Sequence, residues 1–152
     1  SVPNTPIGPI YAALNSPVAT PEVESNAAFA LFQIATVAKT DTDGTMSSTL
    51  LGLLNSPQPH VRAQSALSLG LIKANLAIPP VTDLLAADPN PEVRTAAAFA
   101  LGQIGSVAST LPLVAALNDP SALTAGTARG ALTRIHGRDL GPDAESWRSA
   151  MR

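Results

Sequence analysis

A twelve-residue segment that occurs four times constrains the fold of this chain more than any other feature. The copies occupy residues 23–34, 61–72, 93–104 and 124–135 of the 152-residue sequence. Each ends in isoleucine, and these isoleucines lie 38, 32 and 31 residues apart. A unit repeated at such an interval buries its apolar face only against neighbouring units, so the sequence predicts a solenoid.

Each copy is predicted to form the longer helix of a helical hairpin. Apolar residues of the third copy follow the helical period and mark one buried face: Val93, Ala97, Ala98, Leu101 and Ile104. A shorter apolar segment precedes each copy, at residues 10–14, 50–54, 81–86 and 111–117. No segment shows sustained strand alternation. We therefore expect an all-α chain, a short right-handed α-solenoid of about four helical hairpins with a C-terminal capping helix.

Proline, glycine and polar residues place the boundaries. We expect one domain over residues 1–152, with units at about residues 8–38, 46–76, 78–108 and 110–136 and a cap at 137–152. Residues 1–8 are predicted to be extended, and residues 39–45 to form an exposed polar loop. Gly137 and Gly141 end the fourth long helix, and Trp147 would then cover the last unit. Three pairs indicate an N-cap followed by the first helical residue: Thr20-Pro21, Asn90-Pro91 and Asp119-Pro120.

Composition narrows the classes of function. Charged residues make up 13% of the chain, against about 25% in an average domain. The net charge is −2 and no basic cluster occurs, which argues against nucleic-acid binding. No apolar run is long enough to span a membrane. Cysteine is absent, so the sequence offers no disulfide, thiolate nucleophile or Cys-based metal site.

The first residue and the lysine content bear on processing and location. The chain begins with Ser1, so we expect a processed or trimmed product. Lysine occurs only at Lys39 and Lys73, and uncharged polar residues are many, which favours a periplasmic or otherwise exported protein.

The repeat itself resembles a known family. Its pattern, Val-Arg-x-x-Ala-Ala-x-Ala-Leu-Gly-x-Ile, is similar to the bacterial HEAT-like repeat of phycobilisome-lyase-like proteins. The third copy matches every fixed position, whereas the second has Ser65 for an alanine and the first has Glu24 and Phe32 for Arg and Gly. The fourth copy is degenerate. The resemblance implies that the longer helices line a concave surface and that the array holds other proteins.

Enzymes of the wider family use residues that can be sought in this chain. HEAT-like hydroxylases carry His-Glu pairs that bind metal, but neither His60 nor His136 precedes a glutamate. HEAT-like DNA glycosylases use a basic groove, which this chain lacks. The resemblance leaves a chromophore-lyase-like role open, although no residue marks a tetrapyrrole site.

Few residues suggest chemistry of their own. Asp41, Asp43 and Gly44 resemble part of a calcium loop, but the twelfth position counted from Asp41 is Gly52 and not an acid, so we expect a solvated loop. No nucleophile elbow or phosphate-binding loop occurs. The sequence thus predicts no catalytic residue, no cofactor and no metal ion.

Two arginines occupy the same position in consecutive units. Arg62 and Arg94 would line up at about the 10 Å spacing of packed helices. Asp88, Glu92 and Glu24 are possible partners. We expect these residues to form a structural ladder between units.

Variable positions of the repeat form one stripe per helix, because they advance by three or four residues. Stacking would align Phe29, Leu67 and Phe99 into an apolar ridge flanked by Gln33 and Gln103. Two interpretations stay open: the ridge is an exposed partner site, or it packs between units as core. The candidate partner-binding residues are Phe29, Gln33, Gln64, Leu67, Leu71, Phe99, Gln103 and Arg134.

These observations support two hypotheses of different class. The first is a non-catalytic scaffold, a small subunit of a larger assembly, that binds a partner protein on its concave face. The alternative is an accessory enzyme or chromophore-lyase-like protein that handles a small ligand in the groove.

Overall fold

The computed structural model describes residues 7–16, 19–41 and 44–152. Over these residues the chain forms nine α-helices and two short 3₁₀ segments, Asn75–Ala77 and Val107–Ser109, and no strand. The all-α prediction is therefore confirmed.

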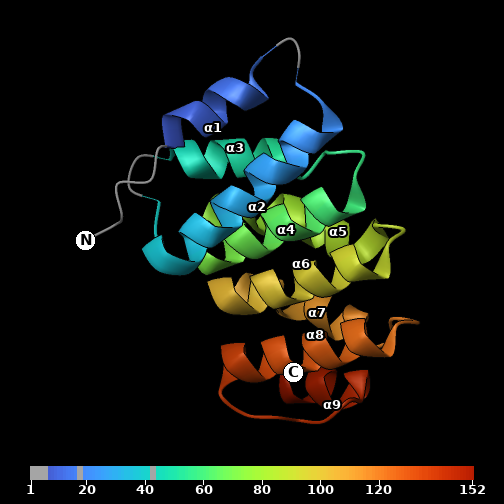
Figure 1. The fold of residues 1–152 in the computed structure, drawn as a ribbon. Helices are drawn as coiled ribbons and strands as arrows, with labels where there is room; N and C mark the ends of the chain where they lie inside the picture. Colours follow the sequence, from blue (N-terminus) through green and yellow to red (C-terminus); the bar gives the residue numbers. More distant parts are fainter. Residues whose placement is uncertain (1–6, 17–18, 42–43) are drawn as a thin grey trace.

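The helices form four consecutive hairpins and a terminal helix. The pairs are α1 (Ile7–Leu14) with α2 (Pro21–Ala38), α3 (Thr45–Leu53) with α4 (Pro59–Leu71), α5 (Ile78–Ala87) with α6 (Pro91–Ile104), and α7 (Thr110–Ala116) with α8 (Ala122–His136); α9 (Ala144–Ala150) follows. The longer helices α2, α4, α6 and α8 stack side by side in one layer, in front of α5 and α7 in Figure 1. This arrangement is a short α-solenoid, as predicted.

Two of the three predicted N-caps are confirmed and one is wrong. Thr20 caps α2 and Asn90 caps α6, each followed by a proline at the first helical position. In front of α8 the cap is Ser121 and not Asp119, because the Asp119 carboxylate accepts the Ser121 N–H instead. That helix consequently begins two residues after Pro120.

The N-terminal segment differs from the prediction. Ile7 and Gly8 are helical and open α1, whereas residues 1–6 of the expected extended segment lie outside the described residues. The predicted loop after α2 begins at Lys39, which adopts a left-handed conformation with φ of 57°. Within this loop Asp43 lies outside the described residues, and Asp41 accepts a hydrogen bond from the Ser47 N–H in the first turn of α3.

The C-terminal cap forms as predicted. Gly137, with φ of 75°, ends α8, and α9 packs beneath the last hairpin against α7. Trp147 is only 2% exposed and belongs to the continuous core, while its indole N–H donates to the Gly141 carbonyl. A buried tryptophan thus covers the apolar end of the stack.

Successive long helices touch backbone to backbone at glycines. A Cβ atom built on Gly70 would lie 2.6 Å from the Ala100 Cα, and one built on Gly102 would lie 2.7 Å from the Ala131 Cβ. In both pairs the tenth position of one repeat faces the eighth position of the next. The small residues of the repeat therefore set the spacing of α4, α6 and α8.

We predict opposite effects from placing alanine at two helical glycines. Gly102→Ala should lower the free energy of unfolding by about 1–3 kcal/mol, because its Cβ overlaps the backbone of α8. Gly130→Ala should raise it by about 0.5–1 kcal/mol, because alanine favours helix and a Cβ there meets no atom within 4 Å. Urea denaturation of the two variants measures both effects. Equal effects would contradict the close packing of α6 on α8.

Candidate functional site

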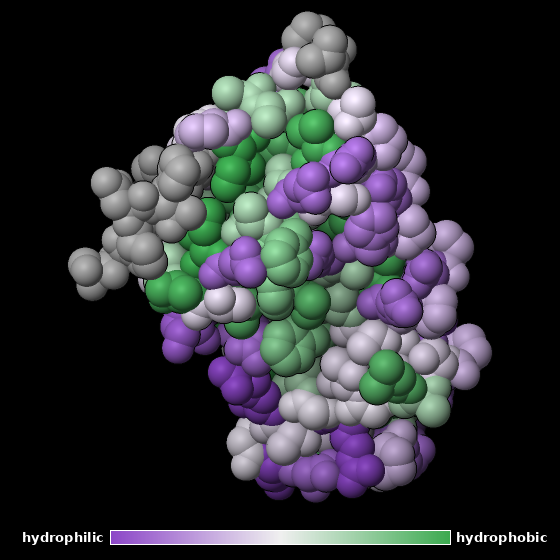
Figure 2. Space-filling model, in the orientation of Figure 1, coloured by the Kyte–Doolittle hydropathy of each residue, from purple (hydrophilic) through white to green (hydrophobic). Residues whose placement is uncertain are grey.

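The predicted ridge lies on the long-helix layer, and its two phenylalanines are exposed. Phe29 in α2 is 52% exposed and Phe99 in α6 is 39% exposed. Leu67, at the matching position of α4, is half-buried and packs against the core. Figure 2, in the orientation of Figure 1, shows apolar surface along the middle of this face, interrupted by polar side chains. The aromatic members of the ridge are thus exposed at the surface, whereas Leu67 contributes to the core.

The remaining candidate residues divide in the same way. Gln33 and Arg134 are exposed, whereas Gln64, Leu71 and Gln103 are half-buried. Leu71, like Leu67, packs against the core. The two leucines therefore contribute to folding as well as to the surface.

Only part of the candidate set meets at one place. A groove of about 290 Å³ lies between α6 and α8 on the long-helix face, and its lining is mainly apolar. Of the candidate residues, Phe99, Gln103 and Arg134 line it. Thr127 and Gly130, which lie on the variable stripe but were not candidates, line it as well, together with Gly102 and Ala131. The structure does not bring Phe29, Gln33, Gln64, Leu67 or Leu71 to this groove.

The groove exists because a side chain is missing. Gly130 holds in α8 the position that Phe29, Leu67 and Phe99 hold in the other long helices. The ridge therefore stops at Phe99 and gives way to a hollow, which we call the Gly130 notch and define by its seven lining residues. The sequence signal for it was a glycine where the other copies carry a large apolar residue.

A larger hollow lies elsewhere. It measures about 360 Å³ and is lined by residues of α1, α2 and α3 and of the turn after α1: Leu14, Asn15, Glu24, Ser48, Thr49, Gly52 and Leu53. None of the candidate residues lines this hollow, and its surface is as polar as it is apolar.

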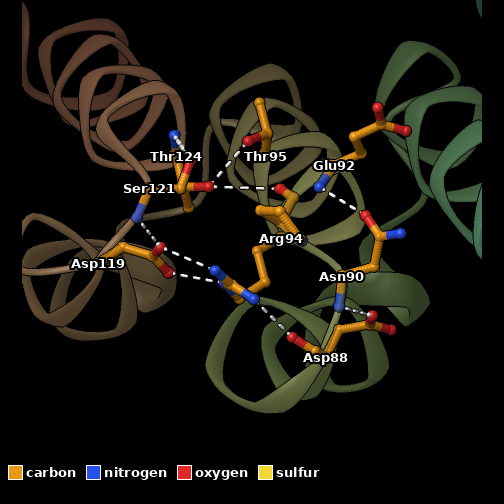
Figure 3. Close-up of polar contacts among 9 residues, drawn as sticks. Asp88, Asn90, Glu92, Arg94, Thr95, Asp119, Ser121 and Thr124 are labelled. Carbon is orange, nitrogen blue, oxygen red and sulfur yellow. Dashed lines mark hydrogen bonds and ion pairs between the residues drawn. The ribbon is translucent and has the colours of Figure 1, made fainter.

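The arginine ladder forms, with one partner that was not predicted. Arg62 binds the Asp88 carboxylate through Nε and Nη2 at 2.8 and 3.0 Å, as expected. Arg94 binds Asp119 in the same way, at 2.8 and 3.1 Å, and its Nη1 also donates to the Asp88 carbonyl (Figure 3). Glu92 is exposed and takes no part in this ladder.

The first unit continues the ladder with neutral partners. Glu24, at the position of the two arginines, accepts hydrogen bonds from the Ser56 hydroxyl and the Gln58 amide of the next turn. The second position of the repeat thus reaches the next unit in all three junctions. This is a structural function, as predicted.

Burial and pairing act in opposite directions on the two ladder carboxylates. Burial alone would raise the pKa of Asp88, but hydrogen bonds from Arg62 and from the Asn90 N–H outweigh it, and this pKa lies below its ordinary value. For Asp119, burial is likewise outweighed by hydrogen bonds from Arg94 and the Ser121 N–H, so its pKa is also lowered. Both carboxylates are therefore held in the charged form that pairs with arginine.

Each histidine bonds to a hydroxyl group of another helix. His60 Nε2 bonds to the Ser25 hydroxyl, and His136 Nε2 lies 2.9 Å from the Thr110 hydroxyl with its ring tilted against Trp147. Over the described ranges, no three His, Cys, Asp or Glu side chains gather in a way that could hold a metal ion. None of the described helices is both long and apolar enough to cross a membrane.

Comparison with known proteins identifies the type of repeat but no individual related protein. A family model of HEAT repeats matches the chain over residues 10–101 and again over residues 47–133. Together the matches run from α1 into α8 and cover well over half of the chain. No curated protein matches the sequence.

We predict that the exposed phenylalanines contribute little to folding. Phe29→Ala and Phe99→Ala should each change the free energy of unfolding by less than about 1 kcal/mol, as surface substitutions do. The control Leu101→Ala removes a fully buried side chain and should cost about 2–5 kcal/mol. Urea denaturation compares the three. If either phenylalanine variant loses several kcal/mol, the ridge is core and does not serve as a partner site.

We predict that the ladder makes stability depend on acid pH. The pKa values of Asp88 and Asp119 are lower in the folded chain, so their contribution is complete above the unfolded value of about 3.9 and is lost as the pH falls through the folded values. Asp119→Asn should cost about 1.5–3 kcal/mol at pH 7, the usual value of hydrogen bonds to charged groups. The deficit relative to the original chain should shrink below about pH 4.

Urea denaturation at neutral and acidic pH measures this difference. The control is Asp83→Asn, which changes an exposed side chain of α5 that makes no hydrogen bond or ion pair within the described part of the chain. A deficit of Asp119→Asn that stays constant with pH would show that the charge of Asp119 is not what stabilises the junction.

Proposed function

The chain belongs to the HEAT-repeat family, and from this premise we propose that it is a non-catalytic scaffold that binds a partner protein. HEAT repeats are commonly protein-interaction scaffolds. The binding surface in this proposal is the long-helix face, formed by α2, α4, α6 and α8. The observation that carries it is the exposure of two phenylalanines, Phe29 and Phe99, in register on this face.

Exposed aromatic rings are unusual enough to support an interface. Only 3% of the residues are aromatic, and the chain has three phenylalanines, two of which are exposed on one face. Aromatic side chains supply much of the binding energy of protein interfaces, because they bury a large area with few rotatable bonds. Amide and hydroxyl groups around them, such as Gln33 and Thr127, suit the polar rim of such an interface.

A second apolar surface supports the proposal that the chain is a small subunit of a larger assembly. Four large apolar side chains in the last turn of α2, in the two 3₁₀ segments and in the first turn of α7 are more than half exposed: Val37, Leu76, Val107 and Leu111. The C-terminal ends of α2, α4 and α6 lie at one edge of the solenoid (Figure 1). Apolar surface beyond scattered residues is typical of chains that other proteins cover.

The alternative function is accessory and chromophore-lyase-like, as in the bacterial, phycobilisome-lyase-like type that the repeat resembles. One observation favours it: the Gly130 notch, at about 290 Å³, approaches the size of small-molecule sites, which begin near 300 Å³. Its lining offers a ligand one charged group, Arg134, and no acid–base pair. We therefore rank this function second.

Photo-crosslinking in the source cell tests the scaffold proposal. The photoreactive residue p-benzoylphenylalanine is placed at Phe29 or Phe99, and as controls at Asp83 in α5 or Ala115 in α7, which are exposed on the short-helix layer. We expect discrete adducts of higher mass from the first two positions and none from the controls. Adducts from neither face, or equally from both, would overturn the assignment of the long-helix face.

A further inference from the structure

We propose that the Gly130 notch receives a large apolar side chain of an acidic peptide segment in the partner protein, and that Arg134 pairs with a carboxylate of that segment. This inference rests on the proposed scaffold function and assigns the chemistry of its partner. Three features of the notch support this proposal: its shape, its charge, and the distance along α8 between Gly130 and Arg134.

The shape of the notch suits one large apolar side chain. Its buried lining is the close contact of Gly102 with Ala131, which leaves no room for a Cβ atom on Gly102, and Phe99 adds an exposed aromatic side chain. An enclosed cavity of about 150 Å³ is enough to hold benzene, so an open groove of about 290 Å³ can accept an aliphatic or aromatic side chain. Such a side chain would extend the row of Phe29, Leu67 and Phe99 into α8.

Nothing in the folded chain requires glycine at position 130. A Cβ atom there would meet no atom within 4 Å, and its backbone is in an ordinary helical conformation. Alanine would favour the helix by about 0.5–1 kcal/mol. The hollow is thus retained at some expense of stability, whereas Gly102 is required by the packing of α8.

The charge at the notch is positive and unpaired. Arg62, Arg94, Arg129 and Arg152 each pair with a carboxylate. The guanidinium of Arg134 is exposed and makes no hydrogen bond or ion pair within the described ranges. No acidic residue lines the notch, and Arg134 is its one charged lining residue. The complementary partner is therefore acidic.

The spacing along α8 restricts the partner sequence. Arg134 follows Gly130 by four residues, which is about 6 Å along the helix axis. An extended peptide advances about 3.3 Å per residue. The carboxylate should therefore lie within about two residues of the apolar anchor.

The first experiment selects ligands without assuming a partner. A phage-displayed library of random dodecapeptides is selected on the purified chain, and a synthetic fluorescent copy of the most enriched peptide is titrated by anisotropy. We expect enriched peptides that carry Asp or Glu within two positions of Leu, Ile, Met or Phe. Enrichment of basic peptides, or of no common pattern, would overturn the proposal.

Two pairs of matched variants then locate the binding. Gly130→Leu fills the notch and should weaken binding of the peptide at least about tenfold. Its control, Gly126→Leu, adds the same side chain one turn earlier on α8, where a Cβ also meets nothing within 4 Å, and should change binding less than about twofold. Arg134→Gln should weaken binding about fivefold and reduce its salt dependence, whereas Arg148→Gln in α9 should leave both unchanged. Equal effects within either pair would overturn the proposal.

A further measurement separates failure of the notch from failure of the scaffold function. Thermal unfolding first shows that Gly130→Leu melts no lower than the original chain. Crosslinking from Phe29 is then repeated in the Gly130→Leu background. Loss of the Phe29 adduct supports the notch as an anchor for the partner. If the adduct persists, the notch proposal fails and the scaffold stands; if Phe29 yields no adduct even in the original chain, the proposed function itself fails.

Discussion

Backbone contact between successive long helices is the constraint on which the rest of this structure depends. Gly70 lies against Ala100, and Gly102 lies against Ala131, with no room for a Cβ atom at either glycine. This contact fixes how far α4, α6 and α8 lie apart. Because of that spacing, Arg94 can donate at once to the Asp88 carbonyl in the turn before α6 and to the Asp119 carboxylate in the turn before α8. The same spacing brings the variable positions into register and forms the buried lining of the Gly130 notch.

The two ends of the array show what replaces this contact where it is absent. In α2 the glycine position holds Phe32, and this helix packs against α4 through side chains of the continuous apolar core, beside the bonds of Glu24 to Ser56 and Gln58. In α8 that position holds Thr133, and the next element is a short helix that covers the stack with Trp147 instead of another hairpin. The glycine–alanine contact therefore belongs to the second and third junctions, between α4 and α6 and between α6 and α8.

The sequence was sufficient to predict features that follow from a local pattern of residues. It was insufficient where one side chain could serve either of two roles, and where a feature is formed by the absence of a side chain. Helical hairpins follow from the period of the apolar residues, and the Arg62–Asp88 pair follows from the repeat. The role of Asp119 did not follow, because a carboxylate before Pro120 can cap a helix or pair with Arg94, and Ser121 settles the choice by capping α8 itself. Periodicity placed Phe29 and Phe99 on a common face but could not show whether a neighbouring element covers that face. The notch was missed because it is made by the side chain that Gly130 lacks.

Positions that join units and positions that face outward are thus separate in this repeat, and the glycines of α6 and α8 show the consequence. Gly102 is required by packing, since any side chain there would push α8 away. Gly126 and Gly130 lie on the outward stripe, where a side chain meets no neighbour and alanine would stabilise the helix. The stability of the fold therefore explains the glycine at position 102, whereas glycine at positions 126 and 130 lowers stability relative to alanine. Gly130 also lines the notch beside the exposed Phe99 and the unpaired Arg134, so this glycine is better explained by the shape of a binding surface than by the needs of its own fold.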